Sequence, residues 1–204
     1  MILLPRLYAI VDSSYRGSTR DLVAFAEDLA SAGCTLLQYR NKSGNAPAIL
    51  QGAQQLKKHV GDNVRLIMND RTDLCLAADF DGVHVGQDDL SPESVRKIIG
   101  PDRWLGVSTH NPEQLRDADL TSADYLAIGP VFATSSKDKP DPVVGLEGVR
   151  RARKLTRKPL VAIGGITREN AAAVIDAGAD CIAVISDLLR EPRKSAEEFL
   201  RILR

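Results

Sequence analysis

The sequence predicts an α/β fold, a closed (β/α)8 TIM barrel that occupies residues 1–204 as a single domain. Short apolar runs rich in Val, Ile and Leu alternate with amphipathic stretches, at about twenty to thirty residues per unit. The first run lacks the GxGxxG turn of a dinucleotide-binding open sheet, and eight evenly spaced units favour a closed barrel. The predicted strands are 7–11, 36–40, 65–69, 82–86, 104–109, 125–129, 159–165 and 181–186.

The stretches between these runs predict helices. In 21–33 the apolar residues recur at spacings of three and four, and Gly33 is placed to cap the C-terminus. Three further stretches, 91–93, 111–113 and 167–169, offer a capping side chain followed by an acidic residue. We therefore expect a helix to begin at each of them.

The composition limits the classes of partner. The chain has 27 basic and 27 acidic residues, so no overall field attracts nucleic acid or an anionic membrane. Cys34, Cys75 and Cys181 are far apart in apolar runs, which is typical of core residues in a reducing compartment. The start does not resemble a signal peptide, and no apolar run approaches the roughly eighteen residues of a membrane span. A cytoplasmic protein without nucleic-acid or membrane partners is expected.

Polar residues gather where the predicted strands end. In a barrel of this kind the chemistry lies at the C-terminal ends of the strands, so these positions form the candidate site. They are 38–42, 69–70, 86–89, 108–110, 129–145, 164–165 and 186–187.

The end of the second strand carries two basic residues. Strand alternation turns Gln38 and Arg40 to the same face, with Lys42 in phase if the strand continues. A guanidinium fork and an ammonium are suited to an anionic ligand. A solvated strand end is the alternative.

Two carboxylates follow the third and fourth strands. Asp70 and Asp89 would lie at the ends of neighbouring strands about 4.8 Å apart and could converge on one ion. Mg²⁺ is held by one or two carboxylates together with substrate phosphates, so the pair suits a metal that carries a diphosphate. Aspartate is also a common helix N-cap, and this alternative stays open.

Two further segments indicate a phosphate site. The pair Gly164 and Gly165 exposes backbone N–H groups beside the strand-eight loop, where barrels often bind phosphate, although a tight turn also needs glycine. The polar stretch 129–145 has the composition of a lid over phosphates, although it could be an ordinary surface loop.

The remaining candidates have structural explanations. His59, His84 and His110 form no metal-binding pattern, so buried or surface roles are expected. The basic run 150–158 keeps apolar residues at helical spacing, which indicates a solvated outer helix face.

Seven motifs stand in order at successive strand ends: Gln38-x-Arg40-x-Lys42, MNDR (68–71), HVGQDD (84–89), GVSTHN (106–111), GPVFATSSK (129–137), AIGGI (162–166) and Ile185-Ser186. Together they resemble the thiamine phosphate synthase (thiamine-phosphate pyrophosphorylase) family over nearly the whole chain. The resemblance implies a transferase that couples 4-amino-2-methyl-5-(diphosphooxymethyl)pyrimidine with 4-methyl-5-(2-phosphoethyl)thiazole. The products would be thiamine phosphate and pyrophosphate, and the cofactor Mg²⁺.

The resemblance also implies residue roles. The pyrimidine diphosphate would be bound by Gln38, Tyr39, Arg40, Asn41, Lys42, Asn69, Ser108 and Lys137. The catalytic residues among these would be Arg40, Lys42, Ser108 and Lys137. The thiazole phosphate would be bound by Thr134, Ser135, Ser136, Gly165, Ile185 and Ser186. Asp70 and Asp89 would hold the metal, with Asp89 favoured over Asp88.

Two departures from the family pattern stand in the thiazole phosphate segments. Ser136 replaces a usual Thr and loses only a methyl group. Asp187 follows Ser186 where a small residue is common, which puts an acid near a predicted phosphate site.

The implied mechanism is a dissociative displacement through a pyrimidinylmethyl cation, which requires no general base. One alternative is a thiazole tautomerase of the same fold, but Pro130 stands where that relative has a histidine. A second is a non-catalytic barrel that senses a phosphorylated metabolite. A homo-oligomer is expected only because homodimers are common among barrels.

Overall fold

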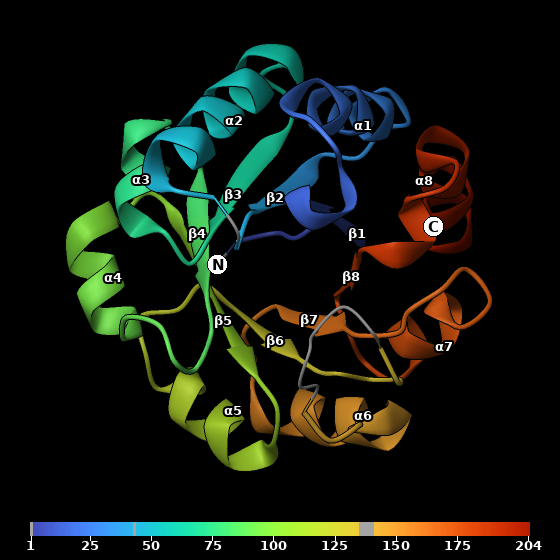
Figure 1. Ribbon diagram of the computed structural model, residues 1–204. Helices are drawn as coiled ribbons and strands as arrows, with labels where there is room; N and C mark the ends of the chain where they lie inside the picture. The colour runs from blue at the N-terminus through green and yellow to red at the C-terminus, as the bar shows by residue number, and fades with distance from the viewer. Residues whose placement is uncertain (1, 43, 135–140) are drawn as a thin grey trace.

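The computed structural model describes residues 2–42, 44–134 and 141–204. Within these residues, eight parallel strands pair in chain order and β8 returns to β1, which closes the barrel (Figure 1). This confirms the predicted (β/α)8 fold. The strands are β1 (Leu7–Asp12), β2 (Leu36–Arg40), β3 (Arg65–Asn69), β4 (Gly82–Val85), β5 (Trp104–Thr109), β6 (Tyr125–Ile128), β7 (Leu160–Ile163) and β8 (Cys181–Val184).

The helices surround the barrel as an outer ring (Figure 1). They are α1 (Thr19–Ser31), α2 (Ala46–His59), α3 (Thr72–Ala77), α4 (Pro92–Ile99), α5 (Pro112–Asp119), α6 (Gly145–Leu155), α7 (Ala171–Asp176) and α8 (Pro192–Ile202). Two 3-10 turns, Ser13–Tyr15 and Ser186–Leu188, follow β1 and β8.

Two of the three predicted helix starts are correct. Ser91 and Asn111 cap α4 and α5 by accepting backbone N–H groups of the first turn. The predicted start at 167–169 is wrong, because α7 begins only at Ala171. The Asn170 side chain instead accepts the backbone N–H of Thr167 and closes a turn ahead of the helix.

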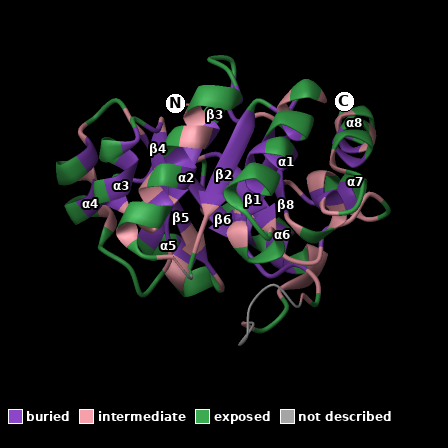
Figure 2. Ribbon diagram, turned by 45° about the horizontal axis from the view of Figure 1, so that its top comes forward, coloured by how far each residue is buried: buried purple, intermediate pink, exposed green. Residues whose placement is uncertain are grey.

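Side chains of the strands alternate between two buried environments. One set packs against the helices, and the other fills the barrel interior. In Figure 2 the strands are buried, while exposed residues lie on the outer sides of the helices. The apolar members of the interior set are Tyr8, Ile10, Leu36, Ile67, Trp104, Tyr125, Ala127, Val161, Cys181 and Ala183, and Leu4, which precedes β1, packs with them.

A repeated acid–base pairing closes the N-terminal end of the barrel. An aspartate just before β4, β6 and β8 accepts a backbone N–H from the preceding strand. The bonds run from Leu66 to Asp81, from Leu105 to Asp124 and from Leu160 to Asp180, each 2.8 Å long. Each aspartate also pairs with an arginine, and we call these pairs the Asp–Arg clasps. They are Asp81–Arg65 at 4.0 Å, Asp124–Arg96 at 2.6 Å and Asp180–Arg153 at 2.7 Å.

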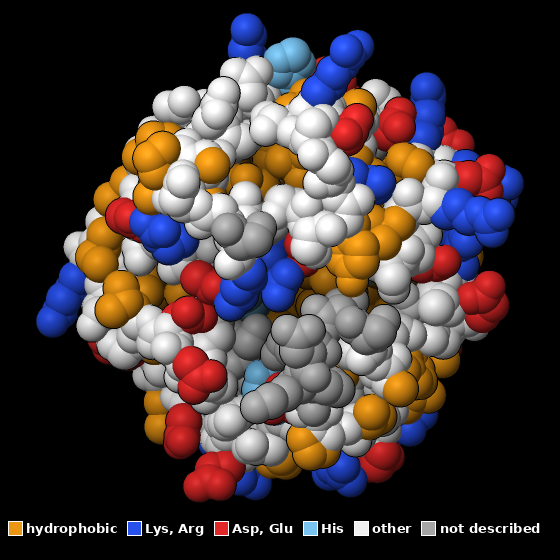
Figure 3. Space-filling view, in the orientation of Figure 1, with side chains coloured by type: hydrophobic (Ala, Val, Ile, Leu, Met, Phe, Trp, Pro, Cys, Tyr) orange, Lys and Arg blue, Asp and Glu red, His pale blue; other side chains and the backbone are white. Residues whose placement is uncertain are grey.

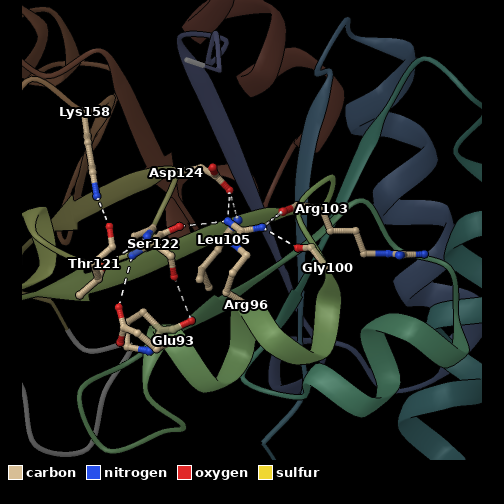
Figure 4. A network of polar contacts seen from close by, with 11 residues as sticks. Glu93, Arg96, Gly100, Arg103, Leu105, Thr121, Ser122, Asp124 and Lys158 are labelled. Atoms are coloured by element: carbon tan, nitrogen blue, oxygen red, sulfur yellow. Dashed lines mark hydrogen bonds and ion pairs between the residues drawn. The ribbon is translucent and has the colours of Figure 1, made fainter.

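The clasp at Arg96 is the most extensively bonded (Figure 4). Besides Asp124, its guanidinium donates to the carbonyl oxygens of Gly100, Arg103 and Ser122 at 2.9, 2.7 and 3.1 Å. These acceptors lie at the C-terminal end of α4 and just before β5 and β6. Arg96 therefore ties α4 to two neighbouring strands.

The clasp at Arg153 corrects the prediction for 150–158. Arg153 is not a solvated side chain, because it pairs with Asp180 and donates to the carbonyl oxygens of Thr156 and Lys158 at 2.5 and 2.9 Å. Only part of that basic run forms the predicted outer face.

In the part of the chain that the structure describes, no helix is both long and apolar enough to span a membrane. The assignment of 1–204 to a single domain stays a prediction.

Candidate active site

A cavity opens at the C-terminal end of the barrel and is lined by residues from all eight strands. Eight predicted site residues meet there: Gln38, Arg40, Asn69, Ser108, Thr134, Gly165, Ile185 and Ser186. Apolar side chains of β1, β7 and β8 form much of the remaining wall. They are Ile10, Val161, Ile163, Ala183 and Val184. The cavity thus joins polar groups at its rim to an apolar interior.

Arg40 reaches the cavity from the last position of β2 and is held by a carboxylate that was not predicted. Its Nη1 forms a short ion pair with Asp12, which is only 2% exposed. The other Asp12 oxygen accepts the backbone N–H and the hydroxyl of Ser14 at 2.9 and 2.7 Å. Asp12 therefore fixes the direction of the guanidinium. A signal for it exists in the sequence, because the first apolar run also ends in a carboxylate.

Asp70 and Asp89 converge at the ends of β3 and β4. Lys42 lies beside them, with its Nζ 2.8 Å from Asp70 Oδ2. Burial raises the pKa of Asp70, the Lys42 ammonium opposes the rise, and the adjacent Asp89 carboxylate adds to it. In Figure 3 acidic and basic side chains lie side by side just left of the centre of this face.

The alternative role of these aspartates as helix caps is excluded. Helix α3 has Arg71 at its N-cap position without a side-chain bond, and α4 is capped by Ser91. Asp89 Oδ2 accepts the backbone N–H of Gly86 at 2.7 Å within a turn. Asp70 holds a φ of 60°, which is uncommon for a residue other than glycine.

The donor set fits a divalent cation of the Mg²⁺ type. Two carboxylates in contact with each other gain from a shared cation, and such ions accept one or two carboxylates plus phosphate and water oxygens. Among the described residues no group of three or more His, Cys, Asp or Glu could hold a metal. A metal at this pair would therefore complete its coordination with ligands from substrate or solvent.

Two predicted residues point away from the cavity. The Tyr39 side chain packs on the outer face of β2, where a Cβ at Gly52 of α2 would come within 2.5 Å of its hydroxyl. Asn41 donates to that hydroxyl at 3.2 Å and accepts the Gly44 N–H at 2.8 Å. Both side chains stabilise the turn after β2.

Ser135, Ser136 and Lys137 lie outside the described residues, so their predicted roles stay predictions.

The glycine pair after β7 has a clear steric cause. Gly164 and Gly165 adopt φ values of 103° and 62°. The loop after β6 packs directly on them, with Phe132 N–H donating to the Gly164 carbonyl at 3.0 Å. A Cβ at Gly165 would lie 2.5 Å from the Ala133 carbonyl oxygen. Close packing thus accounts for both glycines, and phosphate binding there stays a prediction.

Asp187 is neutralised within the chain. Its carboxylate accepts the backbone N–H of Arg168 at 3.0 Å, the Nε at 3.0 Å and the Nη2 at 3.2 Å. Arg168 also pairs with Glu198. The acid beside Ser186 is therefore compensated by its own arginine.

A chain of hydrogen bonds crosses the floor of the cavity, and we call it the interior relay. Gln38 Nε2 donates to Tyr8 Oη at 2.8 Å, and the Tyr8 and Tyr125 hydroxyls lie 3.1 Å apart. Tyr125 Oη lies 3.1 Å from His84 Nδ1, and His84 Nε2 lies 2.8 Å from Ser108 Oγ. His84 is buried, as predicted, but it also lines the cavity. Neither tyrosine was predicted, although both stand at inward positions of their strands.

Comparisons with known proteins identify relatives of this chain. A sequence model of the family described as thiamine monophosphate synthase matches residues 7–188. The thiamine-phosphate synthase of Koribacter versatilis is 62% identical over 203 residues, which are 98% of this chain and 96% of that protein. The thiamine-phosphate synthase of Shouchella clausii is 43% identical over 186 residues, covering 90% of this chain and 88% of that protein.

A solved structure gives the same result. The thiamine phosphate pyrophosphorylase from Pyrococcus furiosus superposes with a TM-score of 0.86 at 32% sequence identity, covering 97% of this chain and 95% of that one. The chain therefore belongs to the thiamine monophosphate synthase family, a family of transferases.

Proposed function

We propose that this protein is a Mg²⁺-dependent thiamine-phosphate synthase. It joins 4-amino-2-methyl-5-(diphosphooxymethyl)pyrimidine to 4-methyl-5-(2-phosphoethyl)thiazole and releases pyrophosphate. One observation carries the proposal: the cavity is lined by Arg40 and Asn69 at the ends of β2 and β3, close in the chain to the Lys42–Asp70 ion pair, and by neutral backbone and hydroxyl groups after β7 and β8. Two phosphorylated substrates need two such regions.

The rim at β2 to β4 is suited to the diphosphate. Arg40 is aimed by Asp12, and Lys42 stands next to the carboxylate pair. Lys137 is proposed to act on the same group. Asp70 and Asp89 would hold the metal. When bound, Mg²⁺ would neutralise charge on the diphosphate and so make it a better leaving group.

The other substrate groups have separate positions. Gln38, Asn69 and Ser108 are proposed to bind the pyrimidine side, with Tyr39 and Asn41 shaping the turn that carries Arg40 and Lys42. The thiazole phosphate would be bound by Thr134, Ser135, Ser136, Gly165, Ile185 and Ser186. Because this second region has no arginine or lysine among its predicted ligands, the thiazole nitrogen can approach without crossing concentrated charge.

The chemistry asks the chain to hold charge and to exclude water. The carbon–oxygen bond to the diphosphate breaks first, and the cationic rim stabilises the leaving pyrophosphate. The thiazole nitrogen then attacks the pyrimidinylmethyl cation. Apolar walls such as Ile10, Val161 and Ile163 line the cavity and protect that cation from hydrolysis. A general base is not required, since the attacking nitrogen carries no proton.

A coupling assay tests the proposal. Purified protein should form thiamine phosphate and pyrophosphate only when both substrates and Mg²⁺ are present, and a chelator should stop the reaction reversibly. Isomerisation of a thiazole carboxylate phosphate without the diphosphate would instead identify a tautomerase. Tight binding of one substrate without coupling would identify a sensor.

A further inference from the structure

We propose that Tyr125 and His84 are positioning residues that orient the Ser108 hydroxyl toward the pyrimidine and thereby select an aminopyrimidine. The inference rests on the proposed function, because Ser108 and Gln38 are the proposed pyrimidine ligands. These two ligands are the two ends of the interior relay. Tyr125 and His84 connect them across the barrel.

The glycine in the middle of β5 supports the relay independently. A Cβ at Gly106 would lie 2.1 Å from Tyr125 Cζ and 2.4 Å from His84 Nδ1, in the space that their hydrogen bond occupies. Glycine weakens a strand interior and is typical of places where another group approaches closely. Gly106 stands opposite His84 in the β4 pairing and opposite Tyr125 in the β6 pairing. The strand therefore leaves room for the relay.

The hydrogens of the relay follow one direction. Burial raises the pKa of Tyr8 and Tyr125, so each hydroxyl keeps its hydrogen. Tyr8 accepts from the Gln38 amide, and donating to Tyr125 gives the buried Tyr8 hydroxyl hydrogen an acceptor. Tyr125 then donates to His84 Nδ1, which leaves the hydrogen on Nε2 to donate to Ser108. Ser108 accepts this bond and keeps its own hydrogen for a ligand.

This direction defines a recognition pattern. At one end, Gln38 donates one of its two Nε2 hydrogens to Tyr8, which fixes the plane of the amide and leaves Oε1 to accept from a ligand. At the other end, Ser108 presents a donor. A 4-aminopyrimidine offers an amino donor next to an acceptor ring nitrogen and matches this pattern. A 4-oxo analogue offers the reverse and leaves buried polar groups unpaired, which is the basis of strong rejection.

The first experiment compares these two substrates. For wild type and Tyr125→Phe, kcat/KM is measured with the 4-amino and the 4-oxo pyrimidine diphosphates. The discrimination ratio is kcat/KM for the 4-amino substrate divided by kcat/KM for the 4-oxo substrate. Tyr125→Phe keeps the ring and removes only the hydroxyl that joins Tyr8 to His84, so this ratio should fall about tenfold. The KM for the thiazole phosphate should not change. An unchanged discrimination ratio would overturn the proposal.

A double-mutant cycle tests whether the effect passes through Ser108. If Tyr125 acts by orienting that hydroxyl, Tyr125→Phe should cost nothing further in a Ser108→Ala background. Losses that multiply would show independent action and contradict the relay. His84→Gln keeps an amide that can donate to Ser108, so it should retain more discrimination than His84→Leu. Equal loss in both variants would also contradict it.

Controls separate the relay from stability and from the proposed function. Thr156→Val deletes a buried hydroxyl at the opposite end of the barrel and should lower Tm without changing discrimination. Tyr8→Phe breaks the relay at another link and replaces Tyr125→Phe if that variant does not fold. If wild-type protein does not couple the substrates, the proposed function fails. The relay is then tested by binding, as the Kd of the 4-oxo diphosphate divided by the Kd of the 4-amino diphosphate. An equal ratio in wild type and variant would overturn the relay.

Discussion

Arg96 and Arg40 belong to opposite ends of the barrel and differ in how their guanidinium groups are bonded. Arg96 has four oxygen partners, the carboxylate of Asp124 and three backbone carbonyls. Among the described residues Arg40 has one, the carboxylate of Asp12. A guanidinium has five N–H donors, so Arg40 keeps several of them for a ligand and Arg96 does not.

The two ends therefore use the same residue types for different purposes. At the N-terminal end charges are satisfied within the chain and hold strands to helices. At the C-terminal end Asp70 and Asp89 lie against each other, and the pKa of Asp70 is raised by burial and by its neighbour. Such an arrangement is unfavourable without a ligand. The contrast predicts that substitutions at one end change stability, and that substitutions at the other change activity.

The largest expected effect is at the carboxylate pair. Asp70→Asn or Asp89→Asn should lower Mg²⁺-dependent coupling by about a thousandfold, since each removes a proposed metal ligand. The unfolding temperature of the metal-free protein should not fall, because relief of the contact between two carboxylates offsets the lost bonds. Initial rates over a Mg²⁺ titration and a thermal melt with chelator measure both quantities.

A matched control is Asp88→Asn, which changes the neighbouring acid in the same turn. It should leave the Mg²⁺ dependence unchanged. Equal losses in Asp88→Asn and Asp89→Asn would contradict the choice of Asp89 as ligand.

The next effect is at an Asp–Arg clasp. Asp124→Ala removes the partner of Arg96 and the acceptor of the Leu105 N–H, so the free energy of unfolding should fall by about 2 kcal/mol. Values of kcat/KM should stay within about twofold of wild type at a temperature where the variant is folded. Urea unfolding and steady-state kinetics test this. A large loss of kcat/KM with normal stability would break the contrast between the two ends.

The third prediction concerns Asp12, which resembles a clasp residue but lies at the functional end. Asp12→Asn keeps the side-chain size and removes the charge that directs Arg40. We expect kcat/KM for the pyrimidine diphosphate to fall about tenfold, because the guanidinium is no longer held in one direction. Added guanidinium should not restore the rate, since the native group is still present. A change in stability without a change in kinetics would place Asp12 with the clasps.

Much of the fold can be predicted from the sequence, because the signals for strands and helices are local. Buried parallel strands appear as short apolar runs, and their even spacing leaves the closed barrel as the natural solution. The start of α7 is the exception, since Thr167 looks like a cap while Asn170 closes the turn. A cap and a turn use the same residue types, so the sequence does not distinguish them.

The candidate site can be predicted from the sequence only in part, because some of its contacts join residues that are far apart in the chain. Residues at strand ends can be selected from their position, and Gln38, Arg40, Asn69 and Ser108 do meet at one cavity. The contacts of Asp12 with Arg40 and of Tyr8 with Tyr125 join residues 28 and 117 positions apart. Asp12 and Arg40 stand opposite each other on the neighbouring strands β1 and β2, whereas Tyr8 and Tyr125 meet across the barrel interior. Contacts between residues so far apart in the sequence leave no periodic signal. Gly106 inside β5 is a local sign, because glycine in a strand interior is typical of places where another group approaches closely.

The smallest expected effect belongs to an exposed pair close to the carboxylates. Arg71 and Asp73 form two hydrogen bonds at 2.9 and 2.5 Å, and the Arg71 guanidinium lowers the pKa of Asp73. A depressed carboxyl pKa adds stability above the unfolded pKa and loses it as pH falls through the folded one. Because the Asp73 side chain is 62% exposed, solvent screens the pair, and Asp73→Asn should change the free energy of unfolding by less than about 0.5 kcal/mol.

The difference in the free energy of unfolding between wild type and Asp73→Asn should depend on pH. Urea unfolding at neutral pH measures the difference in the free energy of unfolding between the two proteins. This difference should disappear in acid, because Asp73 is then protonated and no longer differs in charge from asparagine. Coupling activity should be unchanged, since Asp73 bonds to Arg71 and does not line the cavity. A large loss of coupling activity would mean that activity depends even on the charge of solvent-exposed side chains near the rim. The contrast between the two barrel ends would then rest on distance from the cavity and no longer on how each charge is satisfied.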